Sequence, residues 1–159
     1  MKHSNILIAA FSGTSAEVLA GEMKHDILLL PSRRERDARL LRQALEKKQY
    51  AYVIGMGQKP VIRNKVYIET TARDGSEIYR TAFDCLRLEN ILAQQGISAK
   101  ISQNAGSSYC NSIYMNGLKS IKETGQGTKM VFLHVPFEKN IDDMDHFRGA
   151  VTRAIEEVK

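Results

Sequence analysis

The chain has 159 residues, of which 43% are hydrophobic and 26% are charged, and its formal net charge is +5. Such values are typical of a globular protein with a core of its own, and they exclude a disordered or fibrous chain. No apolar run approaches the length of a membrane span, and the N-terminal apolar run is too short for a signal sequence. We therefore expect one cytoplasmic domain over residues 1–159, with no membrane segment.

Cysteine content and charge distribution narrow the function further. The two cysteines, Cys85 and Cys110, are too few for a disulfide framework or a four-ligand zinc site, so we expect reduced thiols and no metal. The positive charge is concentrated in one segment with a helical pattern, which favours a solvated helix face over a nucleic-acid site. The basic residues of that segment are Arg33, Arg34, Arg36, Arg39, Arg42, Lys47 and Lys48. We expect no nucleic-acid partner.

In the first third of the chain, apolar runs alternate with helical patterns. Strands are expected over residues 4–11, 26–31 and 50–56. Helices are expected from the Ser12–Ser15 turn through Met23, and from a capping box at Ser32 to about Gln49. Residues 57–60, with a glycine and a proline, are expected to break the third strand, and their loop is a candidate site.

The remainder of the chain continues the alternation. Further strands are expected over residues 65–71, 97–103 and 129–134. Further helices are expected from Gly75 through Ile78 to about Gln95, from about Tyr109, and from near Asn140 with Asp142 and Asp143 in its first turn. About six strands alternate with five helices. This pattern predicts a three-layer α/β/α sandwich around a mostly parallel, twisted sheet of about six strands.

Cys110 is the first candidate catalytic residue, because it lies where a predicted strand gives way to a helix. Unpaired N–H groups and the helix dipole in a first helical turn stabilise a thiolate, which is the reactive form of cysteine. The alternative, a small buried packing residue, stays open for Cys110. Packing inside a helix is the role expected of Cys85.

His134 is the second candidate, at the end of a predicted strand. Sites in open α/β sheets gather at strand ends, so Cys110 and His134 could project from the same edge. A thiolate and an imidazole in contact form an ion pair that can attack a carbonyl and then protonate the departing amine. A surface or capping histidine at a strand end remains the alternative.

Several segments together resemble one known family. SQNAGSSYCNSIYMNGL resembles the active-site stretch of the pyroglutamyl peptidase I (pyrrolidone carboxyl peptidase) family of cysteine peptidases, and MVFLHVPF resembles its histidine segment. ILIAAFSGTS is similar to the opening strand and loop of the family, YVIGMGQKP to its Gly-Gln segment, and KVYIETTAR to the strand before its active-site arginine. The resemblance covers nearly the whole chain in order and implies a pyrrolidone carboxyl peptidase-like fold.

The resemblance implies roles for individual residues. Cys110 would be the nucleophile and His134 the general base and acid, with no metal or organic cofactor. Phe11 would pack on the pyrrolidone ring, the backbone around Gln58 would bind the lactam, and Arg73 would help to hold the reaction site. The implied substrate is an N-terminally pyroglutamylated peptide or a related lactam amide, and the implied assembly is a homo-dimer or homo-tetramer. A core phenylalanine and a surface arginine are the alternatives for Phe11 and Arg73.

Two features depart from the family pattern. Asn64 stands where the resemblance places the catalytic glutamate, so we expect Asn64 to orient the imidazole; Glu69 is expected on the opposite face of its strand. The opening FSGTS turn and the connection after Arg73 are shorter than in the family. The sequence therefore supports a cysteine exopeptidase and, as an alternative, a catalytically impaired relative that serves as a small-molecule or peptide binding module.

Overall fold

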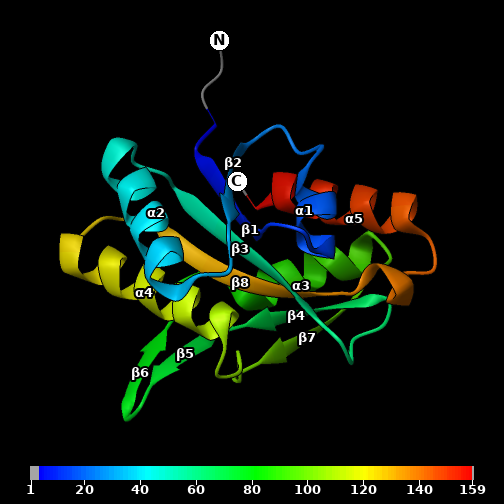
Figure 1. The fold of residues 1–159 in the computed structure, drawn as a ribbon. Helices are drawn as coiled ribbons and strands as arrows, with labels where there is room; N and C mark the ends of the chain where they lie inside the picture. Colours follow the sequence, from blue (N-terminus) through cyan, green and yellow to red (C-terminus); the bar gives the residue numbers. More distant parts are fainter. Residues whose placement is uncertain (1–3, 159) are drawn as a thin grey trace.

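The computed structural model describes residues 4–158, which form one central sheet with helices on both faces (Figure 1). The sheet has six strands in the order β2-β1-β3-β8-β4-β7. Their bounds are Ile6–Phe11 (β1), Asp26–Leu30 (β2), Tyr52–Lys59 (β3), Lys65–Glu69 (β4), Ser98–Ser102 (β7) and Lys129–Pro136 (β8). The α/β/α architecture predicted from the sequence is confirmed.

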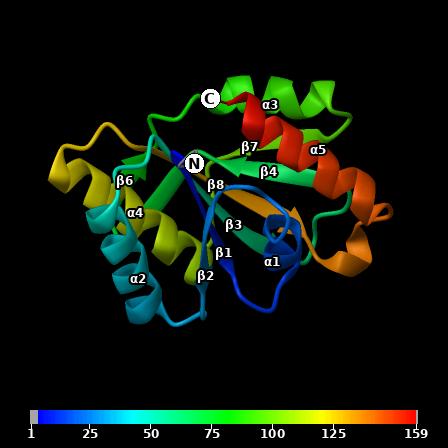
Figure 2. The same cartoon turned by 90° about the horizontal axis from the view of Figure 1, so that it is seen from above.

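Five α-helices make up the two outer layers. Their bounds are Ser15–Ala20 (α1), Arg34–Lys47 (α2), Cys85–Gln94 (α3), Tyr109–Thr124 (α4) and Met144–Glu157 (α5). Helices α1, α3 and α5 bury apolar residues against one face of the sheet, and α2 and α4 against the other (Figure 2). Strands β1, β3 and β8 are apolar on both faces because helices cover them on both sides, while Ile27 and Leu29 of the edge strand β2 stay exposed.

One strand pairing decides which residues meet at the site. Neighbouring strands run parallel except β4 and β8, which are antiparallel and place Tyr67 directly opposite His134. Because β4 runs against β8, Glu69 lies opposite Phe132, on the same face of β4 as Tyr67. The reversed direction of β4 therefore brings the end of that strand beside the imidazole of His134.

The prediction of a long helix from Gly75 to about Gln95 is wrong for the first half of that segment. Thr71–Asp74 (β5) and Glu77–Arg80 (β6) form a separate antiparallel hairpin, and Gly75 makes its turn at φ 59°. Helix α3 begins only at Cys85, where the Asp84 carboxylate accepts a hydrogen bond from the Arg87 N–H at 3.0 Å. A capping carboxylate and a left-handed glycine outweigh the apolar spacing here.

Three other boundaries differ from the sequence-based expectation. Strand β3 continues through the Gly-Gln-Lys segment instead of breaking there. Ser32 does not cap α2: it adopts a left-handed φ of 62°, and Arg33 is the N-cap. A 3₁₀ turn, Glu138–Asn140, precedes the last helix, and Asp143 caps α5 through the His146 N–H.

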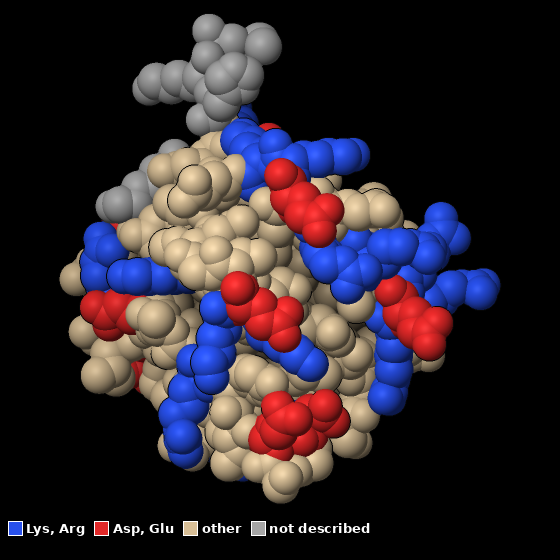
Figure 3. All heavy atoms as spheres, turned by 90° about the vertical axis from the view of Figure 1, so that its left-hand side faces the viewer, with Lys and Arg blue, Asp and Glu red and all other residues tan. Residues whose placement is uncertain are grey.

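The face that carries α2 and α4 has both signs of charge. Figure 3 shows acidic side chains lying among the basic ones over these helices, so the lysines and arginines form no unbroken positive surface there. Among residues 4–158, no helix has the length and apolar character that crossing a bilayer requires.

Tyr114 anchors the strand that carries Glu69, and this contact is testable. The Tyr114 hydroxyl is buried and donates to the Glu69 carbonyl oxygen at 2.7 Å. We expect Tyr114→Phe to lower the free energy of unfolding in urea by about 1–2 kcal/mol, because the carbonyl loses a buried donor. Tyr79→Phe removes a hydroxyl that bonds the exposed Glu77 and is the matched control, with a change of under about 0.5 kcal/mol. Equal changes in the two variants would contradict this anchoring.

Candidate active site

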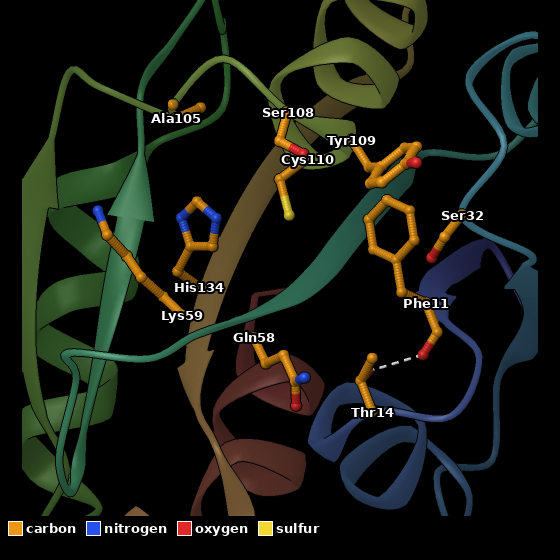
Figure 4. A pocket seen from close by; sticks show the side chains of 11 residues that line it. Phe11, Thr14, Ser32, Gln58, Lys59, Ala105, Ser108, Tyr109, Cys110 and His134 are labelled. Atoms are coloured by element: carbon orange, nitrogen blue, oxygen red, sulfur yellow. Dashed lines mark hydrogen bonds between the residues drawn. The ribbon is translucent and has the colours of Figure 1, made fainter.

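A cavity of about 310 Å³ lies where β1, β3 and β8 end and α4 begins. The parallel direction of these three strands brings their carboxyl ends to one edge of the sheet. Eleven residues line the cavity: Phe11, Thr14, Ser32, Gln58, Lys59, Ala105, Gly106, Ser108, Tyr109, Cys110 and His134 (Figure 4). It therefore brings together four of the six residues singled out from the sequence.

Cys110 is the second residue of α4, and its sulfur lies against the backbone of β3. A Cβ atom at Gly57 would come within 2.5 Å of the Cys110 Sγ and 3.0 Å of the Phe132 ring. A Cβ at Gly55 would similarly lie 2.6 Å from that ring. The two glycines of β3 are thus needed for close approach of side chains, not for breaking the strand.

His134 is held by a buried carboxylate. Its Nδ1 lies 3.1 Å from Oε2 of Glu69, and its ring packs edge-on to Phe132 with centroids 5.1 Å apart. Glu69 is completely buried, and among the described residues its second oxygen, Oε1, has no hydrogen-bond partner. Because Nδ1 is engaged by Glu69, Nε2 is the ring nitrogen left for the cavity, and Figure 4 shows a ring nitrogen on the side of the Cys110 sulfur.

Asn64 does not orient the imidazole, so that expectation is wrong. It precedes β4 in a left-handed conformation, φ 51°, which asparagine tolerates better than most residues. Its side-chain amide donates to the Asp142 carboxylate at 2.7 Å and accepts from the Asp142 N–H at 2.9 Å. Asn64 therefore joins two loops, and Glu69 occupies the place beside His134.

The surroundings of Cys110 favour the protonated thiol. Burial and then the Glu69 charge raise the pKa of Cys110 to about 12, while the Lys59 ammonium lowers it. Desolvation is the largest of these effects, so burial opposes the thiolate that a first helical turn would favour. Cys85 lies in the core under the opposite face, where burial raises its pKa to about 11, consistent with the packing role expected for it.

Aromatic side chains form one end of the cavity. Phe11 is buried at the end of β1, and the ring of the half-exposed Tyr109 lies near it in Figure 4. The guanidinium of Arg34 lies 5.7 Å from the Tyr109 ring centroid. Gln58 lines the cavity as well, and its side-chain oxygen accepts a hydrogen bond from the Ser15 N–H at 3.1 Å. The site thus combines an apolar wall with a fixed amide.

Arg73 is not among the residues that line the cavity. Its side chain is exposed on β5, while its backbone is fixed by the side chain of Asn111, next to Cys110. The Arg73 N–H donates to Asn111 Oδ1 at 3.0 Å, and Asn111 Nδ2 donates to the Arg73 carbonyl at 2.7 Å. These two bonds tie the hairpin to the first turn of α4.

Sequence reasoning gave no catalytic or binding role to three residues at the site: Glu69, Lys59 and Tyr109. Glu69 and Tyr67 alternate with the core residues Val66 and Ile68, which was the available signal that Glu69 faces away from the α3 side of the sheet. The antiparallel pairing of β4 with β8 was not readable from that pattern. Within residues 4–158, no group of three or more His, Cys, Asp or Glu side chains is arranged to hold a metal ion.

The fold and the site describe an α/β protein with a cysteine, a histidine and a buried carboxylate at one sheet edge. The sequence profile of the pyroglutamyl peptidase family matches residues 63–157, more than half of the chain. The chain therefore belongs to the pyroglutamyl peptidase family.

Individual relatives agree with this family. A pyrrolidone-carboxylate peptidase of Bacillus licheniformis is 32% identical over 76 residues, which are 46% of this chain and 35% of that protein. The matched part thus spans about a third of the length of that curated relative.

Among solved structures, the pyrrolidone carboxyl peptidase from Thermococcus litoralis superposes with a TM-score of 0.80 at 21% identity, covering 98% of this chain and 92% of that one. The enzyme from Fervidobacterium islandicum AW-1 gives 0.85 at 18% identity, covering 99% and 98%. Both solved structures therefore share the fold of this chain.

The raised pKa of Cys110 predicts its alkylation behaviour. In a Cys85→Ser background, we expect the iodoacetamide rate to rise about tenfold per pH unit from pH 7 to pH 10, because the thiolate fraction rises in that proportion below the pKa. Lys59→Met should slow the reaction about two- to fivefold, since a cation that lowers the pKa is lost. Lys119→Met, at an exposed position of α4, is the control. A rate that is already flat between pH 6 and pH 8 would contradict a protonated resting thiol.

Proposed function

We propose that this protein is a cysteine peptidase that hydrolyses the amide bond after an N-terminal pyroglutamyl residue, with Cys110 as nucleophile and His134 as general base and acid. The observation that carries the proposal is the contact of Glu69 with Nδ1 of His134, whose ring lines the same cavity as Cys110. Membership of the pyroglutamyl peptidase family supplies the substrate class.

The buried carboxylate determines what the imidazole can do. Glu69 accepts a hydrogen bond from Nδ1–H, which fixes the ring orientation and leaves Nε2 free to take a proton. A positive charge on the ring would be stabilised by a carboxylate that is fully buried and has one oxygen unpaired among the described residues. The interaction therefore strengthens as the imidazole takes up a proton.

The reaction then follows from a protonated resting thiol. His134 Nε2 accepts the proton of Cys110 as the sulfur bonds to the pyroglutamyl carbonyl carbon, so no free thiolate is required beforehand. The carbonyl oxygen gains negative charge near the first turn of α4, where Ser108 makes no side-chain capping bond and backbone N–H groups are available. His134 returns the proton to the departing amine as the C–N bond breaks. Water then hydrolyses the thioester, and the acid and the thiol are released.

The apolar end of the cavity suits the ring of the substrate. A pyrrolidone ring is flat and neutral, and Phe11 and Tyr109 offer aromatic surface at that end. Its lactam N–H and C=O need partners there, since an unpaired polar group costs about 1–3 kcal/mol when buried. The backbone around Gln58 at the end of β3 is the nearest source of such partners.

The binding-module alternative rested on the absence of a carboxylate at Asn64. Glu69 beside His134 removes that reason, and the neutral resting thiol of Cys110 is the remaining observation in its favour. Turnover distinguishes the two candidate functions.

Hydrolysis of a fluorogenic pyroglutamyl amide tests the proposal. We expect Cys110→Ala and His134→Ala to abolish turnover, and Glu69→Gln to lower kcat by about 10²–10⁴-fold, because the imidazolium loses its counter-charge. Cys85→Ser is the matched control and should retain activity, since Cys85 lies under the other face of the sheet. Asn64→Ala should likewise stay within about threefold of wild type. Turnover that survives Cys110→Ala, or a folded wild type without turnover, would overturn the assignment.

A further inference from the structure

Three lysines gather around one tyrosine on the sheet next to His134. Nζ of Lys59, Lys65 and Lys100 lie 5.2, 5.8 and 5.4 Å from the centroid of the Tyr67 ring. None of the three ammonium groups forms an ion pair with a carboxylate among residues 4–158. Three ammonium groups around one ring make the local potential positive, so this cluster, which we call the Tyr67 lysine cluster, favours an anion.

The cluster continues the row of residues that contains the catalytic candidates. Across the sheet, Gly57 pairs with His134, His134 with Tyr67, and Tyr67 with Lys100. The Cys110 sulfur lies over Gly57, at one end of this row. Since paired residues of neighbouring strands share a face, the order along the sheet is thiol, imidazole, tyrosine, lysine.

The order of these residues along the sheet indicates on which side of His134 the leaving peptide lies. The imidazole protonates the departing amine, so the leaving peptide must lie within reach of His134. The row beyond His134, away from the thiol, leads to Tyr67 and Lys100. Figure 4 shows the Lys59 side chain extending beside His134 on the side away from Cys110. Lys59 also lines the cavity, which joins the cluster to the site.

The surface around Tyr67 is open to a ligand. Helices α2 and α4 pack over the part of this face formed by β2, β1, β3 and β8 (Figures 1 and 2). Lys65 and Tyr67 on β4 are half-buried, and Lys100 on β7 is exposed. The carboxylate nearest in sequence on the same face, Glu69, is buried against His134 and so is not a surface counter-charge.

We propose that the Tyr67 lysine cluster is the subsite for the leaving peptide and selects substrates with an acidic residue directly after the pyroglutamyl group. Neighbouring strands are about 4.8 Å apart, so Tyr67 and Lys100 lie about one and two strand spacings from His134. An extended peptide advances about 3.3–3.6 Å per residue, which brings a carboxylate at this position within reach of the ammonium groups. This inference rests on the proposed function, because it uses the position of the leaving amine.

Two peptides of equal size test the selection: pyroglutamyl-glutamic acid α-amide and pyroglutamyl-glutamine α-amide, with release followed by mass spectrometry. We expect kcat/KM for the acidic peptide to exceed that for the neutral one by about three- to tenfold at low salt. The ratio should fall towards one in 0.5 M NaCl, because the lysines are near solvent. Lys100→Glu should lower the ratio about two- to fivefold or more. Lys129→Gln, an exposed lysine at the start of β8, should leave it unchanged.

Binding to the Cys110→Ala variant separates this inference from the proposed function. Calorimetry with the same two peptides needs no turnover, and we expect the same preference for the acidic peptide there. If wild type hydrolyses both peptides at equal rates, the subsite assignment is wrong and the peptidase assignment stands. If nothing is hydrolysed, the peptidase assignment fails, and the subsite assignment is then decided by calorimetry: equal affinities for the two peptides overturn it.

Discussion

The contact between His134 and Glu69 is the interaction on which the site depends. A carboxylate with no exposed surface needs a hydrogen-bond partner, and here that partner is one ring nitrogen of His134. The same contact orients the imidazole and leaves the other nitrogen for the cavity. The Tyr114 hydroxyl and the Phe132 ring hold the two partners in place from the core. The same contact thus provides the partner that the buried Glu69 needs and the orientation that the imidazole of His134 needs.

The sheet supplies the remaining positions by two devices. The antiparallel pairing of β4 with β8 places Glu69 next to a histidine from a strand of opposite direction. The glycines of β3 leave room for the Cys110 sulfur, so that the thiol lies one strand away from the imidazole. Burial of that sulfur raises the pKa of Cys110. The thiol therefore has to be activated by His134 as the base rather than by the helix terminus.

Much of this arrangement was predictable from the sequence, and the failures have physical reasons. Apolar runs identified the six strands of the sheet, and the position of Cys110 after a strand identified the start of α4. The helix expected through Ile78 was wrong, because Gly75 allowed a hairpin that apolar spacing cannot exclude. Asn64 was selected over Glu69 because the family resemblance placed the catalytic glutamate at Asn64. The direction of β4 relative to β8 decides which residue faces His134, and this is a long-range property that local patterns do not encode.

The tautomer of His134 tests this account most directly. In ¹⁵N-labelled protein at pH 8.5, where an ordinary imidazole is neutral, long-range ¹H–¹⁵N spectra distinguish a protonated Nδ1 from a protonated Nε2. His134→Ala identifies the signals among those of the four histidines. We predict that Nδ1 carries the proton and that Glu69→Gln perturbs this ring more than any other. A ring protonated at Nε2, or one indifferent to Glu69→Gln, would show that the carboxylate does not orient the base.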